Sequence, residues 1–206
     1  MMKKKKKQTP VQVKIKDEES LFYTVEVFDK DGKLLERVSA PSKSYCRGWN
    51  QIINEYAWGG GPTIVNTSGV GKVPSNTSPH FLNSDAAIGA VAQGIRVGRG
   101  STPVAIDDYA LETVCGEGSG ANEFKHQAMV FTAPSVDGST ISFTMQRLAV
   151  NDSGSDILVR EIGCYNRFHP VATTEYLLGF RDVLPGILTI PDGGSIRVTY
   201  TLELTV

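Results

Sequence analysis

The most regular hydrophobic pattern of the chain lies in residues 195–206. Apolar and polar side chains alternate there without a break. A period of two places the two sets on opposite faces of a β-strand. The pattern predicts a strand with one packed and one polar face, as is common in antiparallel sheets. The polar face is expected to meet either solvent or another subunit. The apolar positions are Ile196, Val198, Tyr200, Leu202, Leu204 and Val206.

Shorter alternating or β-rich runs predict further strands on both sides of a central region of different character. Segments rich in Gly, Asp, Asn and Ser separate these runs, and the Asp31-Gly32 pair is typical of a β-hairpin turn. The spacing predicts a mainly β fold, an antiparallel β-sandwich of jelly-roll-like type. The expected strands cover residues 11–16, 22–28, 34–38, 94–97, 124–133, 140–149, 157–165, 176–182 and 186–190.

The central region contains the one segment with helical periodicity. In residues 44–58 the apolar side chains follow a helical spacing, and a Gly-Gly-Gly-Pro sequence follows at 59–62. We therefore predict one short amphipathic helix with its aromatic face packed in the core. Residues 59–90 show little periodicity and are expected to form a long loop, which is functional or is ordered by a partner. The predicted organisation is an arm at 1–10 and a single domain at 11–206.

The charges are distributed unevenly. The chain carries 21 basic and 22 acidic residues, and five of the basic ones form a single run, so the rest of the chain has 16 basic residues and a net charge of about −6. This run is the candidate partner-contact site, because closely spaced cations pair with carboxylates; a solvated segment that aids solubility is the alternative. An acidic body with one basic run does not favour nucleic acid as a partner. The run consists of Lys3, Lys4, Lys5, Lys6 and Lys7.

No motif in the sequence predicts a catalytic, metal or cofactor site. The segment Gly69-Val-Gly-Lys72 lacks the Ser or Thr and the first glycine of a phosphate-binding loop. The three histidines and three cysteines stand apart from one another, so we predict no bound cofactor. The cysteines are expected to be small buried hydrophobic residues. No apolar run approaches the roughly 18–20 residues that cross a bilayer, so no membrane partner is expected.

Two charged pairs interrupt the apolar strands, namely Arg160-Glu161 and Arg181-Asp182. Adjacent strand residues point to opposite faces, so each pair is expected to serve two different neighbours. Cross-strand ion pairs and subunit contacts are both compatible with this pattern.

Several short segments in residues 94–206 resemble virion structural proteins of tailed bacteriophages. The segment Gly98-Arg-Gly-Ser-Thr-Pro-Val-Ala-Ile-Asp-Asp-Tyr-Ala-Leu111 is similar to a Gly-x-Gly-Thr/Ser segment followed by Asp-x-Ala-Leu in such proteins. It is followed, in the same order, by Arg160-Glu-Ile-Gly-Cys-Tyr165, Arg181-Asp-Val-Leu184 and Val198-Thr-Tyr-Thr201.

The resemblance implies a β-sandwich particle component that assembles symmetrically and has no enzymatic activity. We therefore expect a capsid-associated decoration or cementing subunit, which forms a homo-oligomer and contacts other virion proteins such as the major capsid protein. Its expected location is the virion, after assembly in the cytoplasm of the host bacterium. A tail, baseplate or receptor-binding component is the alternative, and a β-sandwich hydrolase or lyase is a second alternative.

Overall fold

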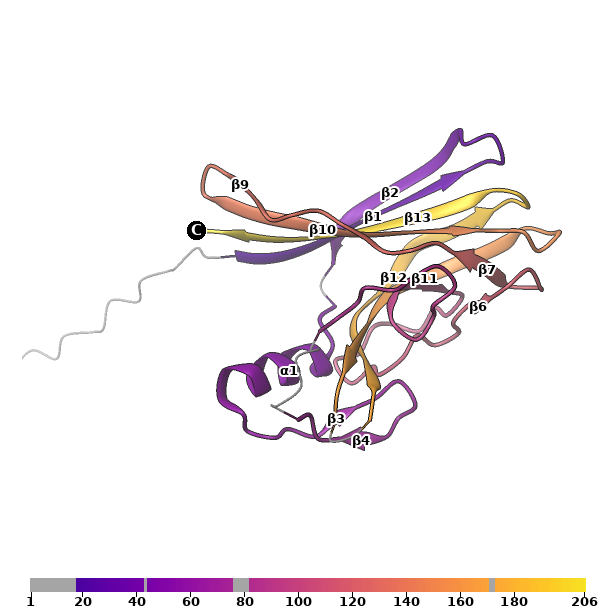
Figure 1. The fold of residues 1–206 in the computed structure, drawn as a ribbon. Coiled ribbons are helices and arrows are strands. Elements are labelled where there is room, and N and C mark those ends of the chain that lie inside the picture. The colour runs from indigo at the N-terminus through magenta and orange to yellow at the C-terminus, as the bar shows by residue number, and fades with distance from the viewer. Residues whose placement is uncertain (1–17, 43, 76–81, 171–172) are drawn as a thin grey trace, which may run out of the picture.

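The structure is a computed structural model that describes residues 18–42, 44–75, 82–170 and 173–206 (Figure 1). It is mainly β, and the described residues contain one helix, as the sequence predicts. Nearly all strand pairs are antiparallel, and the short pair β6–β7 is parallel. The predicted strand at 11–16 and the predicted arm at 1–10, with Lys3–Lys7, lie outside the described residues.

The larger sheet has eight strands and contains the strand of residues 195–206 at its centre. Its order is β2-β1-β13-β10-β7-β6, and β8 and β9 pair with further parts of β10. The bounds are β1 Glu18–Phe28, β2 Leu34–Ser42, β6 Gly116–Glu117, β7 Glu123–His126, β8 Val130–Phe131, β9 Ser135–Asp137, β10 Thr140–Val150 and β13 Ser195–Thr205.

The smaller sheet has three strands in the order β12-β11-β5. A separate two-stranded hairpin, β3–β4, and helix α1 lie at its far end, away from the larger sheet (Figure 1). The bounds are β5 Gly94–Gly98, β11 Ile157–Phe168, β12 Glu175–Ile190, β3 Ile64–Val65, β4 Gly71–Lys72 and α1 Arg47–Trp58.

The two sheets share one hydrophobic core. Alternate residues of β1 and β13, such as Val25 and Val198, are buried against apolar residues of the smaller sheet, such as Val159 and Leu188. Opposite faces of β1 and β13 carry polar residues, which explains the alternating pattern in the sequence. Burial of apolar area is the main favourable term here, so the core lies where the two sheets overlap.

The hairpin β1–β2 forms where the Asp-Gly signal predicts it. Asp29 Oδ1 accepts hydrogen bonds from the backbone N–H groups of Asp31 and Lys33, both at 2.9 Å. Gly32 has a φ of 78°, which glycine adopts without steric cost. The local sequence therefore determines this turn.

Two expected strands, 176–182 and 186–190, are one continuous strand, β12. Val159 of β11 pairs with Leu188 and Glu161 pairs with Val183, so four residues of β12 stand opposite Arg160 alone. The Pro185-Gly186 pair lies in this bulge. Proline is tolerated there because β12 is an edge strand, and its missing N–H leaves no ladder bond unmade. The proline therefore marks a bulge and does not separate two strands.

The expected strand at 124–133 is divided into β7 and β8. Between them, the N–H of Met129 donates to the carbonyl of Ala86 at 2.8 Å, so the backbone leaves the edge of β10. The guanidinium of Arg147 fills the gap and donates from Nε to the carbonyl of Gln127 at 2.8 Å. The strand thus ends where the backbone bonds to Ala86 and to the buried side chain of Arg147 instead of to the backbone of β10.

Helix α1 begins at Arg47, three residues later than predicted, because Tyr45 forms an isolated bridge with Phe180 of β12. The indole of Trp49 packs on the ring of Phe180, with centroids 4.8 Å apart. The helix ends at Gly59, whose φ is 70°. Tyr56 and Trp58 are exposed, so the prediction that all aromatic residues of the segment pack in the core is wrong for these two residues.

The predicted loop at 59–90 is shorter than expected, because it contains the hairpin β3–β4. The side chain of Asn66 holds this turn by accepting hydrogen bonds from the N–H groups of Ser68 and Val70. Residues 76–81 of the segment lie outside the described part. In the part of the chain that the structure describes, the single helix is too short and too polar to cross a membrane.

Candidate docking surface on the large sheet

The larger sheet extends beyond the shared core at one end. Along the apolar face of β13, Tyr200 is fully buried, Leu202 is half-buried, Leu204 is 43% exposed and Val206 is 76% exposed. Figure 1 shows this end, with β9 and the C-terminal residue, projecting away from β11 and β12. We call it the overhang: residues 18–20 of β1, β9, residues 140–144 of β10 and residues 201–205 of β13. In the overhang the alternation of apolar and polar residues continues, but the smaller sheet does not cover the apolar face.

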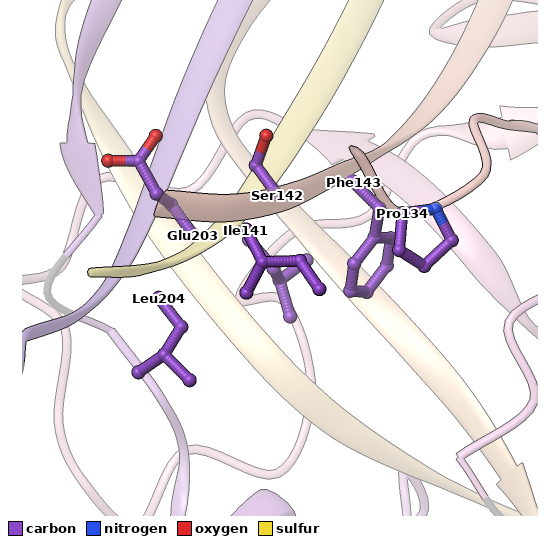
Figure 2. A pocket seen from close by; sticks show the side chains of 7 residues that line it. Pro134, Ile141, Ser142, Phe143, Glu203 and Leu204 are labelled. Carbon is purple, nitrogen blue, oxygen red and sulfur yellow. The ribbon is translucent and has the colours of Figure 1, made fainter. Parts of the chain in front are cut away.

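The apolar face of the overhang forms a groove of about 330 Å³. In the register of β10 and β13, Ile141 stands opposite Leu204, and Phe143 stands opposite Leu202. Pro134 closes one side of the groove. Figure 2 shows Leu204, Ile141, Phe143 and Pro134 on the same side of the ribbon. The groove is therefore built mainly from residues of β10 and β13 and is present in the single chain.

A second hollow continues the same face towards the helix. It has a volume of about 500 Å³, and Phe143 and Leu202 line both hollows. Phe131 of β8 is opposite Met145 and belongs to this face, while Trp49 and Leu82 form the other wall. The second hollow also has polar lining residues, namely Asn83, Ser84, Asp85 and Asn166, so the surface from the tip of the overhang to helix α1 is only partly apolar.

The opposite face of the sheet is polar and its side chains pair with one another. Glu26 of β1 receives Arg197 Nε at 2.8 Å and Arg37 Nη2 at 3.1 Å. Near the tip, Thr140 and Thr205 share a hydrogen bond of 2.9 Å between their Oγ1 atoms. In Figure 2, Ser142 and Glu203 point to this side. The polar face was expected to meet solvent or another subunit. Many of its polar groups instead form pairs between neighbouring strands of the same sheet.

A buried charged cluster lies on the other side of the smaller sheet. Arg181 of β12 donates from Nε to Glu161 Oε2 at 2.9 Å and from Nη1 to Asp108 Oδ2 at 2.8 Å. Burial acts to lower the pKa of Arg181, but the hydrogen bonds with Asp108 and Glu161 outweigh it and raise the pKa. Glu161 also accepts the N–H groups of Gly100 (2.9 Å), Glu112 (3.1 Å) and Thr113 (2.8 Å). The cluster therefore ties the segment 100–113 to the sheet.

This cluster also lines a hollow of about 290 Å³ with Thr102, Tyr109 and Glu112. The side chains of Thr102, Asp108, Glu112 and Arg181 in this hollow already have partners within the chain. Glu112 Oε2 accepts hydrogen bonds from the N–H and the hydroxyl of Thr102 and from the N–H of Ser101, and these lower the pKa of the carboxyl. Arg181 Nη2 donates to the carbonyl of Thr102 at 3.1 Å. These hydrogen bonds hold the loop of residues 100–113 in place.

The four short segments on which the expected family resemblance rests are neighbours in space. Gly163 of the Glu-Ile-Gly segment pairs with Arg181 of the Arg-Asp segment. Tyr200 of the Tyr-Thr segment donates from its hydroxyl to Asp182 Oδ2 at 3.0 Å. With Asp108 bound to Arg181, all four segments meet at β11 and β12. The sequence had suggested that each charged pair serves two neighbours, and Arg181-Asp182 does so, on opposite faces of the sheet.

Asp182 lies between the two sheets and joins them. Its Oδ2 also accepts a hydrogen bond from Ser42 Oγ at 2.9 Å. Burial raises the pKa of Asp182 above its ordinary value of 3.8, although hydrogen bonds from Ser42, Ser44 and Tyr200 oppose the shift. The side chain is thus a polar contact between β12 and the larger sheet, close to the start of α1.

A second set of buried polar contacts is centred on the side chain of Arg147 of β10. All of its donors bind backbone carbonyls, among them Ile95 at 3.2 Å, so it fastens the segment 87–95 to the sheet. His126 lies nearby, with Nδ1 2.6 Å from Glu117 Oε2. Burial, and next to it the charge of Arg96, lower the pKa of His126 to about 4, although the hydrogen bond with Glu117 opposes the shift. The imidazole is therefore neutral at pH 7.

The three cysteines are buried, as predicted. Burial raises the pKa of Cys46 and Cys164 to about 12 and of Cys115 to about 11, so the thiols are protonated at neutral pH. Among the described residues, no three His, Cys, Asp or Glu side chains are arranged to hold a metal ion. His80, like the candidate contact residues Lys3–Lys7, lies outside the described residues.

The overhang was not evident from the sequence. Its residues continue the same alternating pattern as the core, and no residue type marks where the second layer ends. The nearest sequence signal is the length of the strand at 195–206. Comparisons of the chain with protein-family models, with curated proteins and with solved structures give no match.

Proposed function

We propose that this chain is a non-enzymatic structural subunit that assembles with further copies of itself, as a capsid-associated decoration or cementing protein of a tailed-phage virion. The observation that carries the assembly role is the preformed apolar groove on the overhang. The virion role rests on the sequence resemblance, whose segments lie next to one another at β11 and β12. The antiparallel β-sandwich is part of this proposal and is supported by the shared core; its jelly-roll-like type remains a prediction.

An apolar strand face left in water favours association. Ile141, Leu204 and Val136 are all exposed, the last by 70%, and they lie on one face of neighbouring strands. A continuous apolar patch of this kind is typical of an interaction surface, whereas single exposed apolar residues are not. Each Leu or Ile side chain that becomes fully buried contributes about 1.5–3 kcal/mol. The strands are rigid, so little ordering cost opposes binding.

The interior charges support a rigid building block. Arg147, Arg181 and Glu161 are each buried and each bind backbone groups of long loops. Such bonds hold the loops 87–95 and 100–113 in one position, which a subunit needs in order to present the same surface at every site of a symmetric assembly.

The test is the self-association of the full chain, measured by analytical ultracentrifugation. The full chain is expected to form oligomers at about 100 µM, where a micromolar dimer is largely formed. Leu204→Glu is expected to weaken association about 100-fold, because it removes a buried apolar side chain and adds an unpaired charge. Leu158→Glu is the matched control, because Leu158 is equally exposed (43%) and lies on the smaller sheet.

A monomeric full chain, or equal effects of the two substitutions, would refute the assembly role of the overhang. The particle role has a separate test: mass spectrometry of purified particles of the phage that encodes the chain. Many copies per particle support a decoration or cementing subunit. A few copies indicate the tail, baseplate or receptor-binding alternative, and absence from the particle refutes the virion role.

A further inference from the structure

The end of β1 lies beside the groove. Glu18 pairs with Thr205 and Glu19 with Leu204, so the chain enters the larger sheet at the tip of the overhang. The neighbouring strand β2 ends at Ser42, opposite Leu21. Among the described residues, no strand pairs with residues 18–20 on that side. Residues 1–17 therefore join the described structure at the docking surface itself.

We propose that residues 11–16 of a second copy of this chain occupy the groove of the overhang, in a reciprocal exchange. The inference rests on the proposed assembly role and names the segment that performs it. The shape of the segment fits the groove. Residues 11–16, Val-Gln-Val-Lys-Ile-Lys, alternate apolar and polar side chains, and a six-residue strand spans about 20 Å. The overhang segment of β13 has five residues and a length of about 17 Å.

The charges of the two partners are complementary. Residues 1–17 contain seven of the 21 basic residues of the chain and one of the 22 acidic residues, so this segment carries +6. The remaining residues, 18–206, then hold 14 basic and 21 acidic residues and carry −7, which together give the net charge of −1. Opposite charges of this size accelerate the encounter and select the orientation of the segment.

The occupant comes from a second copy because of chain connectivity. Only Asp17 separates residues 11–16 from Glu18, the first residue of β1. A strand that reverses onto its own sheet needs a connection of at least two residues. A segment that continues in the direction of β1 leaves its own groove and reaches outward. Exchange across a two-fold axis places each segment in the groove of the other copy and leaves both grooves filled.

The test uses four single substitutions in the full chain. Val13→Glu places a charge on the apolar side of the segment, and Gln12→Glu adds the same charge to its polar side. Leu204→Glu damages the groove, and Leu158→Glu is the control on the smaller sheet. Val13→Glu and Leu204→Glu are each expected to weaken self-association about 100-fold, because each apolar contact worth about tenfold occurs twice in the exchanged pair. Gln12→Glu and Leu158→Glu are expected to associate like the unmodified chain.

A mixture of the Val13→Glu and Leu204→Glu chains provides the decisive measurement. The first chain has an intact groove and the second has an intact segment, so one contact forms between them. The mixture is expected to give 1:1 heterodimers that neither chain forms alone, and added salt is expected to weaken them. A mixture that remains monomeric overturns the inference, as does undiminished association of the Val13→Glu chain.

The outcomes separate this inference from the proposed function. Loss of association in Leu204→Glu but not in Val13→Glu leaves the overhang as the interface and refutes residues 11–16 as its occupant. A full chain that is monomeric refutes both. Circular dichroism of each variant verifies that the β-structure is unchanged.

Discussion

Replacing Glu161 by Gln changes one oxygen atom of the buried cluster into an NH2 group and leaves the shape of the side chain the same. Each carboxylate oxygen of Glu161 receives two donors. Oε1 accepts from the N–H groups of Gly100 and Thr113, and Oε2 accepts from the N–H of Glu112 and from Arg181 Nε. In either orientation of the amide, the NH2 group therefore faces two donors and can bind neither of them.

The expected magnitude follows from these four bonds. A hydrogen bond to a charged group contributes about 1.5–3 kcal/mol, and breaking one partner of a buried ion pair costs about 3–5 kcal/mol. Glu161 is fully buried, so water does not replace the lost partners. We expect Glu161→Gln to lower the free energy of unfolding by about 3–5 kcal/mol, a large part of the 5–15 kcal/mol that is typical of a domain.

Urea unfolding followed by tryptophan fluorescence measures this loss, with an unchanged m-value as the sign that the native state has the same compactness. Glu112→Gln is the matched control. Glu112 takes its hydrogen bonds from Ser101 and Thr102 at Oε2 alone, so an amide oxygen turned to that side keeps them, and a much smaller loss is expected. If the two variants were equally stable, the bracing role of Glu161 would be wrong.

Three further predictions concern the interior. Asp182→Asn is expected to become more stable relative to the unmodified chain as the pH rises from about 4. The pKa of Asp182 in the folded state is raised above the ordinary value of 3.8, so ionisation of the carboxyl lowers the free energy of unfolding of the unmodified chain, and Asn does not ionise. Urea titrations at several pH values measure the difference between the two chains, and a constant difference would contradict this. Gly163→Ala is expected to lower the free energy of unfolding by about 1–3 kcal/mol. The added Cβ would lie 2.8 Å from Leu111 Cδ2 and 2.8 Å from the carbonyl oxygen of Phe180. An unchanged melting temperature in differential scanning fluorimetry would refute the close contact. Cys164 is expected to react with a thiol reagent only after denaturation, since its pKa is about 12 and its side chain is buried; labelling at an equal rate in the native state would refute this.

Much of the secondary structure could be predicted from the sequence. The hairpin at Asp31-Gly32, the strand at 195–205 and the end of the helix at Gly59 follow from local rules of turn chemistry and periodicity. The errors arose where a distant residue intervened. Arg147 ends the strand after His126, and the bulge opposite Arg160 joins two expected strands into one. The first effect has no local signal, and the Pro185-Gly186 pair in the bulge is equally compatible with a turn between two strands, since both effects depend on which strands are neighbours.

The pattern of residues 195–206 by itself determined that the strand has an apolar and a polar face, because a period of two is a property of the extended backbone. It could not determine what covers the apolar face. Ile196, Val198 and Tyr200 are buried because the smaller sheet lies against them, whereas Leu204 is exposed because that sheet ends before reaching it. Packing between segments far apart in the chain decides burial, so only the tertiary structure distinguished core from docking surface along a single alternating strand.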